Sequence, residues 1–390
     1  MGVTMSKNPS ALLIAALFAV VISAAFMNAS PASADTGYSL DDMYGYWQQG
    51  VSYSIKANLD TKNHFLTGQE VILYTNNSPD TLEKFYLHLY PNAYRDKASA
   101  LIRDYMKGTL YFFMGLPKSM RGWMNVDTLM VNGSKVEFDV TGTILSSKFP
   151  RPLLPGESVS ITIAFSEKVK RKVGRSGYMG QHYDMGQWYP KMVVYDHNGW
   201  HPDQFRLGEF YGEFATYDVS VTLPDDYVIA ATGDPVEGDP GWKEARARAA
   251  ERAKGAGDRG AAGNASRTKA RGMSAAEKAE RLKKISSKEY PNKTVTFHAE
   301  KVHDFAFVAD PSFALQDSLY KGIEIMVFYR PWNRATWQDS VMARTIRTID
   351  WLERIAGPFP YKRMSVVDTP TRGGMEYPML VMNGGADDAL

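Results

Sequence analysis

Apolar and polar residues alternate along much of this chain after residue 50. Every second residue is apolar in residues 51–59, 159–165 and 217–223. Successive side chains of a β-strand point to opposite faces, so this period of two predicts strands with one buried face. Helical periodicity is scarce before residue 240. The pattern therefore predicts a large antiparallel β domain in residues 35–311, built of two packed sheets.

One turn within this region has a specific signal. Asn132-Gly133 separates apolar residues at positions 129 and 131 from further apolar residues at 136, 138 and 140. The pair Asn-Gly favours the two-residue turn that joins adjacent antiparallel strands. We therefore expect a β-hairpin across residues 129–140.

Residues 170–212 break the alternation. Seven glycines are interleaved there with nine aromatic residues. This combination is typical of ordered loops that pack over other elements. Such loops either cap the end of the β domain or line a substrate cleft, and the sequence favours capping.

The period of the pattern changes near the C-terminus. Residues 323–329 alternate as a strand, whereas apolar residues in 337–356 recur every three or four positions, as on one face of a helix. Gly357-Pro358 ends that helix, and another apolar strand follows at residues 364–368. This order predicts that an α+β domain begins near residue 312 and occupies residues 312–390.

A biased segment, residues 241–290, interrupts the β domain. Residues 242–289 contain fourteen Lys and Arg and six Asp and Glu, a local charge of +8 in a chain of net charge +2. The glycines at 255, 257, 260 and 263 interrupt any single helix, and few apolar residues could stabilise a fold. We expect a surface excursion with short solvated helices at 243–253 and 274–285. A basic patch for anionic envelope surfaces is the weaker alternative, and no nucleic-acid-binding face is expected.

The N-terminus predicts export. Lys7 precedes an apolar run at residues 11–25, and Ala32-Ser33-Ala34 has the small-residue spacing of a cleavage site. We interpret residues 1–34 as a signal peptide; an uncleaved anchor is the alternative. The mature protein would have no integral membrane segment and would be periplasmic or extracellular. The chain contains no cysteine, which excludes thiol catalysis, thiolate metal sites and disulfides.

Most searches for catalytic motifs fail. No nucleophile elbow, dinucleotide-binding glycine motif or phosphate-binding loop is present. His197 and His201 stand four residues apart, but Asn198 follows the first histidine and Gly199 and Pro202 disfavour a helix. We therefore expect them to be loop histidines and not metal ligands. His88 is expected on the polar, surface side of its strand.

Glu376 is the remaining candidate. It follows Gly373, Gly374 and Met375 directly after a predicted strand. Glycines allow a second backbone to approach closely, and an unpaired strand edge can bind an extended peptide. A carboxylate there can pair with a peptide's N-terminal ammonium through a charge-assisted hydrogen bond. The alternative is an exposed glutamate with no binding role.

Several segments together resemble a known family. Residues 351–361 (WLERIAGPFPY), 364–368 and 373–378 (GGMEYP) resemble the start of the catalytic domain in alanyl aminopeptidase-like zinc metallopeptidases, family M-one of the gluzincins. Residues 303–310 (HDFAFVAD) resemble the end of that family's β domain. Residues 188–190 (WYP) and 208–214 (GEFYGEF) resemble its bacterial branch. The resemblance extends over residues 53–383.

The resemblance implies a mostly β, saddle- or sandwich-shaped N-terminal domain followed by the truncated start of an α+β, thermolysin-like catalytic domain. In the family, Zn²⁺ is held by two histidines of H-E-x-x-H and a later glutamate, and the motif glutamate activates water. Gly373, Gly374, Met375 and Glu376 match the family's peptide-binding segment, whereas Tyr377 replaces its asparagine. No residue here matches the zinc ligands or other catalytic groups.

The resulting expectation is the N-terminal part of an exported, zinc-dependent, aminopeptidase-like metallopeptidase that acts near the free N-termini of peptides. The chain ends at Leu390 before any H-E-x-x-H helix, so it should bind no Zn²⁺ and be inactive by itself, with Zn²⁺ in the parent protein. One rival is a non-catalytic, peptide-binding β-sandwich module. Another is a parent that acts on a non-peptide substrate.

Overall fold

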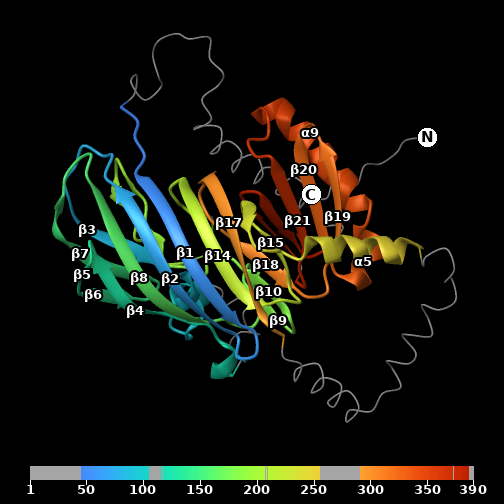
Figure 1. Cartoon of the computed structure of the whole chain (residues 1–390). Helices are drawn as coiled ribbons and strands as arrows, with labels where there is room; N and C mark the ends of the chain where they lie inside the picture. The colour runs from blue at the N-terminus through green and yellow to red at the C-terminus, as the bar shows by residue number, and fades with distance from the viewer. Residues whose placement is uncertain are drawn as a thin grey trace, which may run out of the picture.

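The computed structural model describes residues 45–104, 115, 117–206, 208, 210–254, 290–371 and 373–385, without the side chains of 252–254 (Figure 1). The predicted signal peptide, residues 1–34, lies outside the described residues. So do residues 255–289, which include the predicted helix at 274–285, and Glu209 of the GEFYGEF segment. Among the helices that the structure describes, none is both long and apolar enough to cross a membrane.

The protein is mostly β. Its strands are β1(Gly50–Asp60), β2(Phe65–Thr75), β3(Leu82–His88), β4(Trp123–Val131), β5(Ser134–Lys135), β6(Phe138–Thr141), β7(Ile144–Leu153), β8(Ser158–Lys168), β9(Gly177–Met179), β10(His182–Met185), β11(Lys191–Met192), β12(Tyr195–Asp196), β13(Gly199–Trp200), β14(Ala215–Pro224), β15(Val228–Ala231), β16(Asp234–Glu237), β17(Asn292–Val302), β18(Phe307–Asp310), β19(Ala314–Tyr320), β20(Ile323–Tyr329), β21(Arg363–Asp368), β22(Gly374–Tyr377) and β23(Leu380–Asn383). The helices are η1(Tyr90–Tyr94), α3(Ala100–Asp104), η2(Lys118–Met120), α5(Trp242–Lys254), η3(Pro331–Asn333), α8(Arg334–Trp337) and α9(Ser340–Ala356).

An eight-stranded sheet dominates the N-terminal part, in the order β16-β17-β14-β1-β2-β8-β4-β5 (Figure 1). The three stretches with alternating sequence are β1, β8 and β14, and buried residues alternate with more exposed ones along β1 and β14, as predicted. Part of β8 is buried on both faces. The prediction of an antiparallel domain was wrong at one place, because β1 and β14 pair in parallel.

Two smaller sheets complete this part, so it contains three main sheets and not the two that were predicted. Their orders are β15-β18-β10-β9 and β11-β3-β7-β6. Apolar residues of all three sheets form one continuous core, and Trp188 and Tyr189 from the glycine-aromatic segment lie inside it. That segment therefore packs into the core of the β domain as ordered structure.

The turn at Asn132-Gly133 is confirmed, but the hairpin is shorter than predicted. Both turn residues have positive φ, 48° and 78°, as this type of turn requires. The returning strand β5 is only two residues long. The chain then leaves the large sheet, and β6 forms a second hairpin with β7 around Gly142, whose φ is 62°. The predicted pairing of residues 138 and 140 with β4 is therefore wrong.

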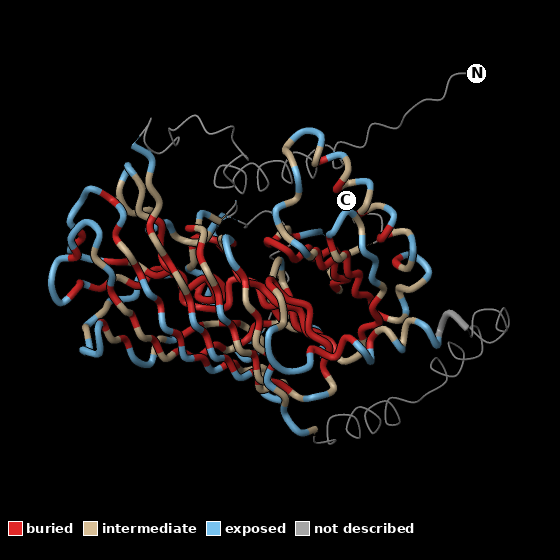
Figure 2. The backbone as a smooth tube through the Cα atoms, turned by 45° about the horizontal axis from the view of Figure 1, so that its top comes forward, coloured by how far each residue is buried: buried red, intermediate tan, exposed pale blue. Residues whose placement is uncertain are grey.

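A five-stranded sheet, ordered β19-β20-β21-β23-β22, forms the C-terminal part. Strands β20, β21 and β23 are parallel, and α9 follows β20 as the sequence predicted. Ile325 and Val327 on one face belong to the core that includes α9, whereas Met326 and Phe328 on the other face join the core of the β domain. Figure 2 shows the buried segments gathered where the two parts meet.

Helix α5 is the described start of the segment predicted as a solvated excursion. It lies beside β19 (Figure 1), with Trp242 and Ala245 in the main core. Arg246 forms an ion pair with Asp317 at 2.9 Å, and Arg248 donates hydrogen bonds to the carbonyl oxygens of Pro311 and Phe313. The helix is confirmed, but it is bound to the protein on one side and is not a fully solvated helix.

Candidate functional site

The segment Gly373–Tyr377 forms the end of the C-terminal sheet. Strand β22 pairs antiparallel with β23 and is the last strand in the described sheet order. Gly373 has φ 97°, in the left-handed region that favours glycine, and its carbonyl oxygen accepts a hydrogen bond from Gly384 N at 2.9 Å. A Cβ on Gly374 would lie 2.9 Å from Asn383 Oδ1. Both glycines are therefore needed for the close pairing of β22 with β23.

Side chains of β22 alternate between the two faces of the sheet. Met375 and Tyr377 are buried in the core shared with the β domain. Glu376 pairs in register with Val381, which belongs to the core that contains α9, so Glu376 points to this second face. Glu376 is partly exposed. The strand thus presents one carboxylate on an outer edge while its two neighbours anchor it.

Tyr377 joins β22 to the glycine-aromatic segment. A Cβ at Gly186 would lie 1.9 Å from the Tyr377 hydroxyl oxygen, so only glycine fits there. Burial raises the pKa of Tyr377 well above its usual value, with Asp304 adding to the shift and Arg175 and Gln187 opposing it. Arg175 and Gln187 therefore lie close to the end of β22.

Sequence reasoning missed Gln187. It is buried, its φ is 52°, which is rare for a residue with a side chain, and its Nε2 has no hydrogen-bond partner among the described residues. Gln187 and Arg175 line a cavity of about 10 Å³, enough for one water molecule. Strained backbone and an unsatisfied amide are costly, and such features concentrate at functional sites. No periodic pattern marks this residue in the sequence.

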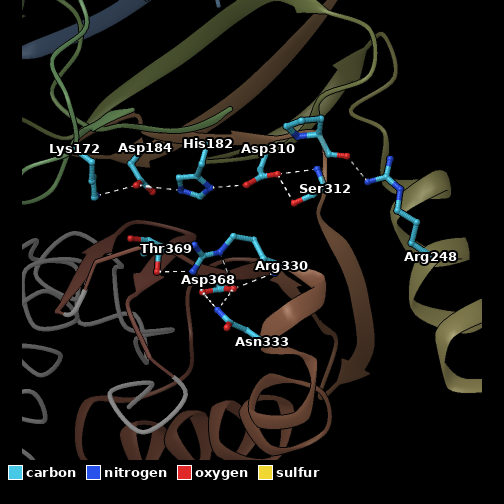
Figure 3. A network of polar contacts seen from close by, with 11 residues as sticks. Lys172, His182, Asp184, Arg248, Asp310, Ser312, Arg330, Asn333, Asp368 and Thr369 are labelled. Atoms are coloured by element: carbon cyan, nitrogen blue, oxygen red, sulfur yellow. Dashed lines mark hydrogen bonds and ion pairs between the residues drawn. The ribbon is translucent and has the colours of Figure 1, made fainter. Parts of the chain in front are cut away.

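An ion pair fixes the chain just before β22. Arg330, at the end of β20, binds Asp368, at the end of β21, through Nη2–Oδ1 at 2.5 Å and Nε–Oδ2 at 3.0 Å (Figure 3). Asn333 Nδ2 donates to both carboxylate oxygens, and Arg330 Nη2 also donates to the carbonyl oxygen of Thr369. This pair fixes the start of the loop that leads to Gly373 and Gly374.

A second buried network crosses the β domain (Figure 3). Lys172 Nζ lies 2.8 Å from Asp184 Oδ2, which lies 3.1 Å from His182 Nε2, and His182 Nδ1 lies 2.9 Å from Asp310 Oδ2. Burial disfavours a charged imidazole, but Asp184 and Asp310 outweigh it and raise the pKa of His182 to about 9. The network contains two cations and two anions at neutral pH, which is the arrangement of a structural buried charge cluster.

The other histidines lie apart from one another. His197 lies in the turn between β12 and β13 and His201 directly follows β13, so both lie outside helices as predicted, and His201 Nε2 lies 2.8 Å from Asp196 Oδ1. Within the described ranges, no three His, Asp or Glu side chains gather in a group that could hold a metal ion. The described residues therefore do not fit a zinc site.

The prediction for His88 was wrong. It lies at the end of β3 and is only 5% exposed. Its ring stacks on Tyr90 with ring centres 4.6 Å apart, and Nδ1 has no partner among the described residues. The alternation of β3 predicts a solvent-facing His88, but the ring is buried, and Val194 and Tyr211 line the same pocket.

Comparison with known proteins identifies the fold. No family model and no curated protein match the chain. Among solved structures it is similar to a two-domain M1 zinc metallopeptidase, a single-residue mutant bound to L-arginine, at 15% identity and a TM-score of 0.50. It is equally similar, at 14% identity and 0.50, to M1 zinc metallopeptidase mutants from Deinococcus radiodurans without and with a Tyr-Ser-Ala substrate.

Each of these alignments covers 87% of this chain and 61% of the solved chain. The chain therefore spans less than two thirds of the length of the structures that it matches. At 14–15% identity the similarity establishes a shared fold with M1 zinc metallopeptidases.

Proposed function

We propose that this chain is the peptide-binding part of an exported, zinc-dependent metallopeptidase of the aminopeptidase type. The proposal rests chiefly on one observation: Glu376 lies on β22, at the edge of the C-terminal sheet. Gly373 and Gly374 precede it in the sequence, where β22 pairs with β23. The shared fold with M1 zinc metallopeptidases supports the same assignment.

In this proposal an extended peptide aligns along the edge of β22. Main-chain hydrogen bonds from the strand would hold the peptide backbone, as in other cases of β-strand addition. The carboxylate of Glu376 would then pair with the ammonium group of the first residue. The buried side chains of Met375 and Tyr377 hold β22 in place, so the strand itself would need little reordering to receive a peptide.

Under this proposal, Zn²⁺ would be bound only in a longer protein that contains this chain. The 390 residues contain no H-E-x-x-H sequence, and the described side chains offer no alternative group of metal ligands. No residue of this chain is therefore assigned a catalytic role. The hydrolytic activity would belong to a protein that also carries those ligands, in which zinc would supply an activated water molecule.

The test is a binding experiment with the chain itself. Calorimetric titration would compare trialanine, which has a free amine, with N-acetyl-trialanine. We expect the free peptide to bind more tightly by about tenfold, and Glu376→Gln to remove that difference, because charge-assisted hydrogen bonds contribute about 1.5–3 kcal/mol. Glu237→Gln is the matched control, since Glu237 is an exposed glutamate on β16, an edge strand of the eight-stranded sheet.

Two results would reject the proposal. Equal affinity for free and acetylated peptides would show that the free amine does not contribute to binding. A preference for the free amine that survives in Glu376→Gln would place the amine site elsewhere. Binding of both peptides with equal affinity, abolished by a disrupted β22, would favour the alternative of a non-catalytic peptide-binding module.

A further inference from the structure

A second pocket lies in the β domain, on the far side of Tyr90 and Phe205 from Gln187. Its volume is about 210 Å³, and its wall includes His88, Tyr90, His201, Phe205, Phe210 and Tyr211. Tyr90 and Phe205 also line the small cavity that contains Gln187, so the two spaces share a wall. An apolar cavity of about 150 Å³ is large enough for benzene, so this pocket can hold one aromatic ring.

The wall is an aromatic cluster. The rings of Phe205 and Phe210 are stacked 5.2 Å apart with an interplanar angle of 12°. Tyr90 packs edge-to-face against both, at 5.5 Å from Phe205 and 4.9 Å from Phe210. Tyr211 and His201 add another edge-to-face pair at 5.3 Å. Aromatic rings prefer these offset and edge-to-face geometries, so a further ring entering the pocket would extend an existing arrangement.

The loop that carries Phe205 is held in place before any ligand arrives. Gln204 Oε1 accepts a hydrogen bond from Thr143 N at 2.8 Å, and Phe205 N donates to Thr143 Oγ1 at 2.8 Å. Gln204 also lies over Gly142, where any Cβ would clash with the amide. A wall fixed in this way loses little conformational entropy on binding.

His88 gives the pocket a specific polar feature. Its ring lines the pocket, and Nδ1 is enclosed by the protein, without a hydrogen-bond partner among the described residues. Burial and the nearby Lys191 lower the pKa of His88 to about 3, so the ring is neutral at physiological pH. A neutral imidazole offers one hydrogen-bond donor and one acceptor. Because Nδ1 is enclosed, a ligand in the pocket would bond to the other ring nitrogen, Nε2, and a ligand with a hydroxyl group would gain this hydrogen bond.

The charges at the mouth are mostly paired already. Arg206 binds Asp104 at 2.7 Å, and Asp196 accepts hydrogen bonds from Tyr211 and lies next to His201. Asp203 is exposed at the rim. Among the described wall residues, the charged side chains are therefore paired or lie at the exposed rim, which favours a neutral guest over a charged one.

We propose that this pocket binds a single aromatic ring that carries a hydroxyl group, the phenol of a tyrosine side chain, with the ring packed among Tyr90, Phe205 and Phe210 and the hydroxyl bonded to His88. The proposal is independent of Glu376 and of any peptidase activity. A free phenol has the same chemistry as the side chain, so the experiment must separate the two sources.

The experiment is an NMR titration of the whole chain with four probes. These are N-acetyl-L-tyrosine amide, N-acetyl-L-phenylalanine amide, N-acetyl-L-arginine amide and 4-methylphenol. None has a free amine, so binding cannot depend on the amine site proposed at Glu376. We expect the tyrosine probe to bind about tenfold more tightly than the phenylalanine probe, because a site built for a hydroxyl discriminates against its absence. The arginine probe should not bind.

Two substitutions assign binding to the pocket. His88→Phe keeps an aromatic ring and removes both nitrogens, so it should equalise the tyrosine and phenylalanine probes without abolishing either. Phe210→Ala should weaken both probes by about tenfold through loss of the ring contacts. Asp139→Asn, at an exposed position on β6, is the control and should change nothing. Near-ultraviolet circular dichroism checks that each variant is folded.

Several results would overturn the proposal. Tighter binding of the arginine probe would make this a cation site. Equal affinity for the tyrosine and phenylalanine probes would show that the hydroxyl group is not bound. A preference for the tyrosine probe that survives in His88→Phe would show that the hydroxyl group is not bonded to His88. Tighter binding of 4-methylphenol than of the tyrosine probe would overturn the side-chain assignment and indicate a small-molecule phenol. Affinities unchanged by Phe210→Ala would place the binding outside the pocket.

Discussion

Arg330 and Asp368 form a two-point ion pair inside the protein, across the carboxyl ends of the parallel strands β20 and β21. The aspartate side chain is fully buried and the arginine is 10% exposed. The backbone N–H of Arg330 also donates to Asp368, at 3.0 Å. The pair joins two strands immediately before the loop that leads into β22, so the position of Glu376 depends on it.

Breaking this pair should strongly destabilise the protein. Asp368→Ala leaves a buried guanidinium without its partner, so we expect the free energy of unfolding to fall by about 3–5 kcal/mol. Urea unfolding followed by tryptophan fluorescence measures the change. Arg151→Ala is the comparison, because it breaks an exposed surface pair with Glu157 and should lower the free energy of unfolding far less. Similar effects of the two substitutions would contradict the structural role of the buried pair.

The His182 network should stabilise the protein only below alkaline pH. The pKa of His182 is raised to about 9 from a usual value of 6.5. A raised pKa means that the folded protein holds the proton more tightly, so the stabilisation is complete below pH 6.5 and lost as pH rises through 9. This shift corresponds to a free energy on the order of 3 kcal/mol. We expect His182→Gln to lower the melting temperature strongly at pH 6 and weakly at pH 10.

Glu167 and Glu213 titrate in the same range, since burial raises the pKa of each to about 8. Their contribution is present in both the parent chain and the His182 variant. The difference between the two melting curves therefore isolates the histidine. A difference that does not depend on pH would show that His182 is neutral in the folded protein.

Glu70 should destabilise the protein at neutral and alkaline pH. Its carboxylate lies fully buried on β2, and neither oxygen has a hydrogen-bond partner among the described residues. Burial raises its pKa well above 4.5. The folded state thus binds the proton more tightly than the unfolded state, and stability falls as pH rises above 4.5. Glu70→Met should therefore raise stability by about 2 kcal/mol at pH 8 and by less at pH 5. Chemical unfolding at the two pH values tests this; a destabilised variant at pH 8 would mean that the carboxylate has a stabilising partner.

Gly186→Ala should displace β22 from its place. The added methyl group would meet the buried hydroxyl of Tyr377 at 1.9 Å, so the ring or the strand must move. We expect weaker binding of the free-amine peptide and a lower melting temperature. Tyr377→Phe in the same chain removes the nearest atom and should restore part of both losses. Unchanged affinity of Gly186→Ala for the free-amine peptide would show that the position of β22 does not depend on this contact.

Local patterns predicted the order of the elements well. The alternation in β1 and β14, the turn at Asn132-Gly133 and the helix α9 all follow from residues close together in the chain. The pairing of β1 with β14 in parallel could not be predicted, because strand partners are chosen by contacts between residues more than 150 positions apart. The error at residues 138 and 140 has a local cause, because a second tight turn at Gly142 pairs these residues with the next strand, β7.

Only part of the candidate site could be predicted from the sequence. Glu376 and its glycines form one continuous segment and could be recognised. Gln187 and His88 could not, because what sets them apart is a backbone angle, burial and a missing hydrogen bond, none of which has a periodic signal. His88 is buried although the alternation in the sequence of β3 predicts exposure, and residues distant in the sequence, such as Val194 and Tyr211, line the pocket beside it.

Strand β20 has apolar side chains on both faces, one set against α9 and the other against the β domain. A fragment that began near residue 312 would expose Met326 and Phe328 to water, and it should aggregate when produced alone. The two parts of the chain therefore cannot be separated near residue 312 without exposing apolar side chains to water. Heating should unfold both halves in one transition, as a single cooperative unit.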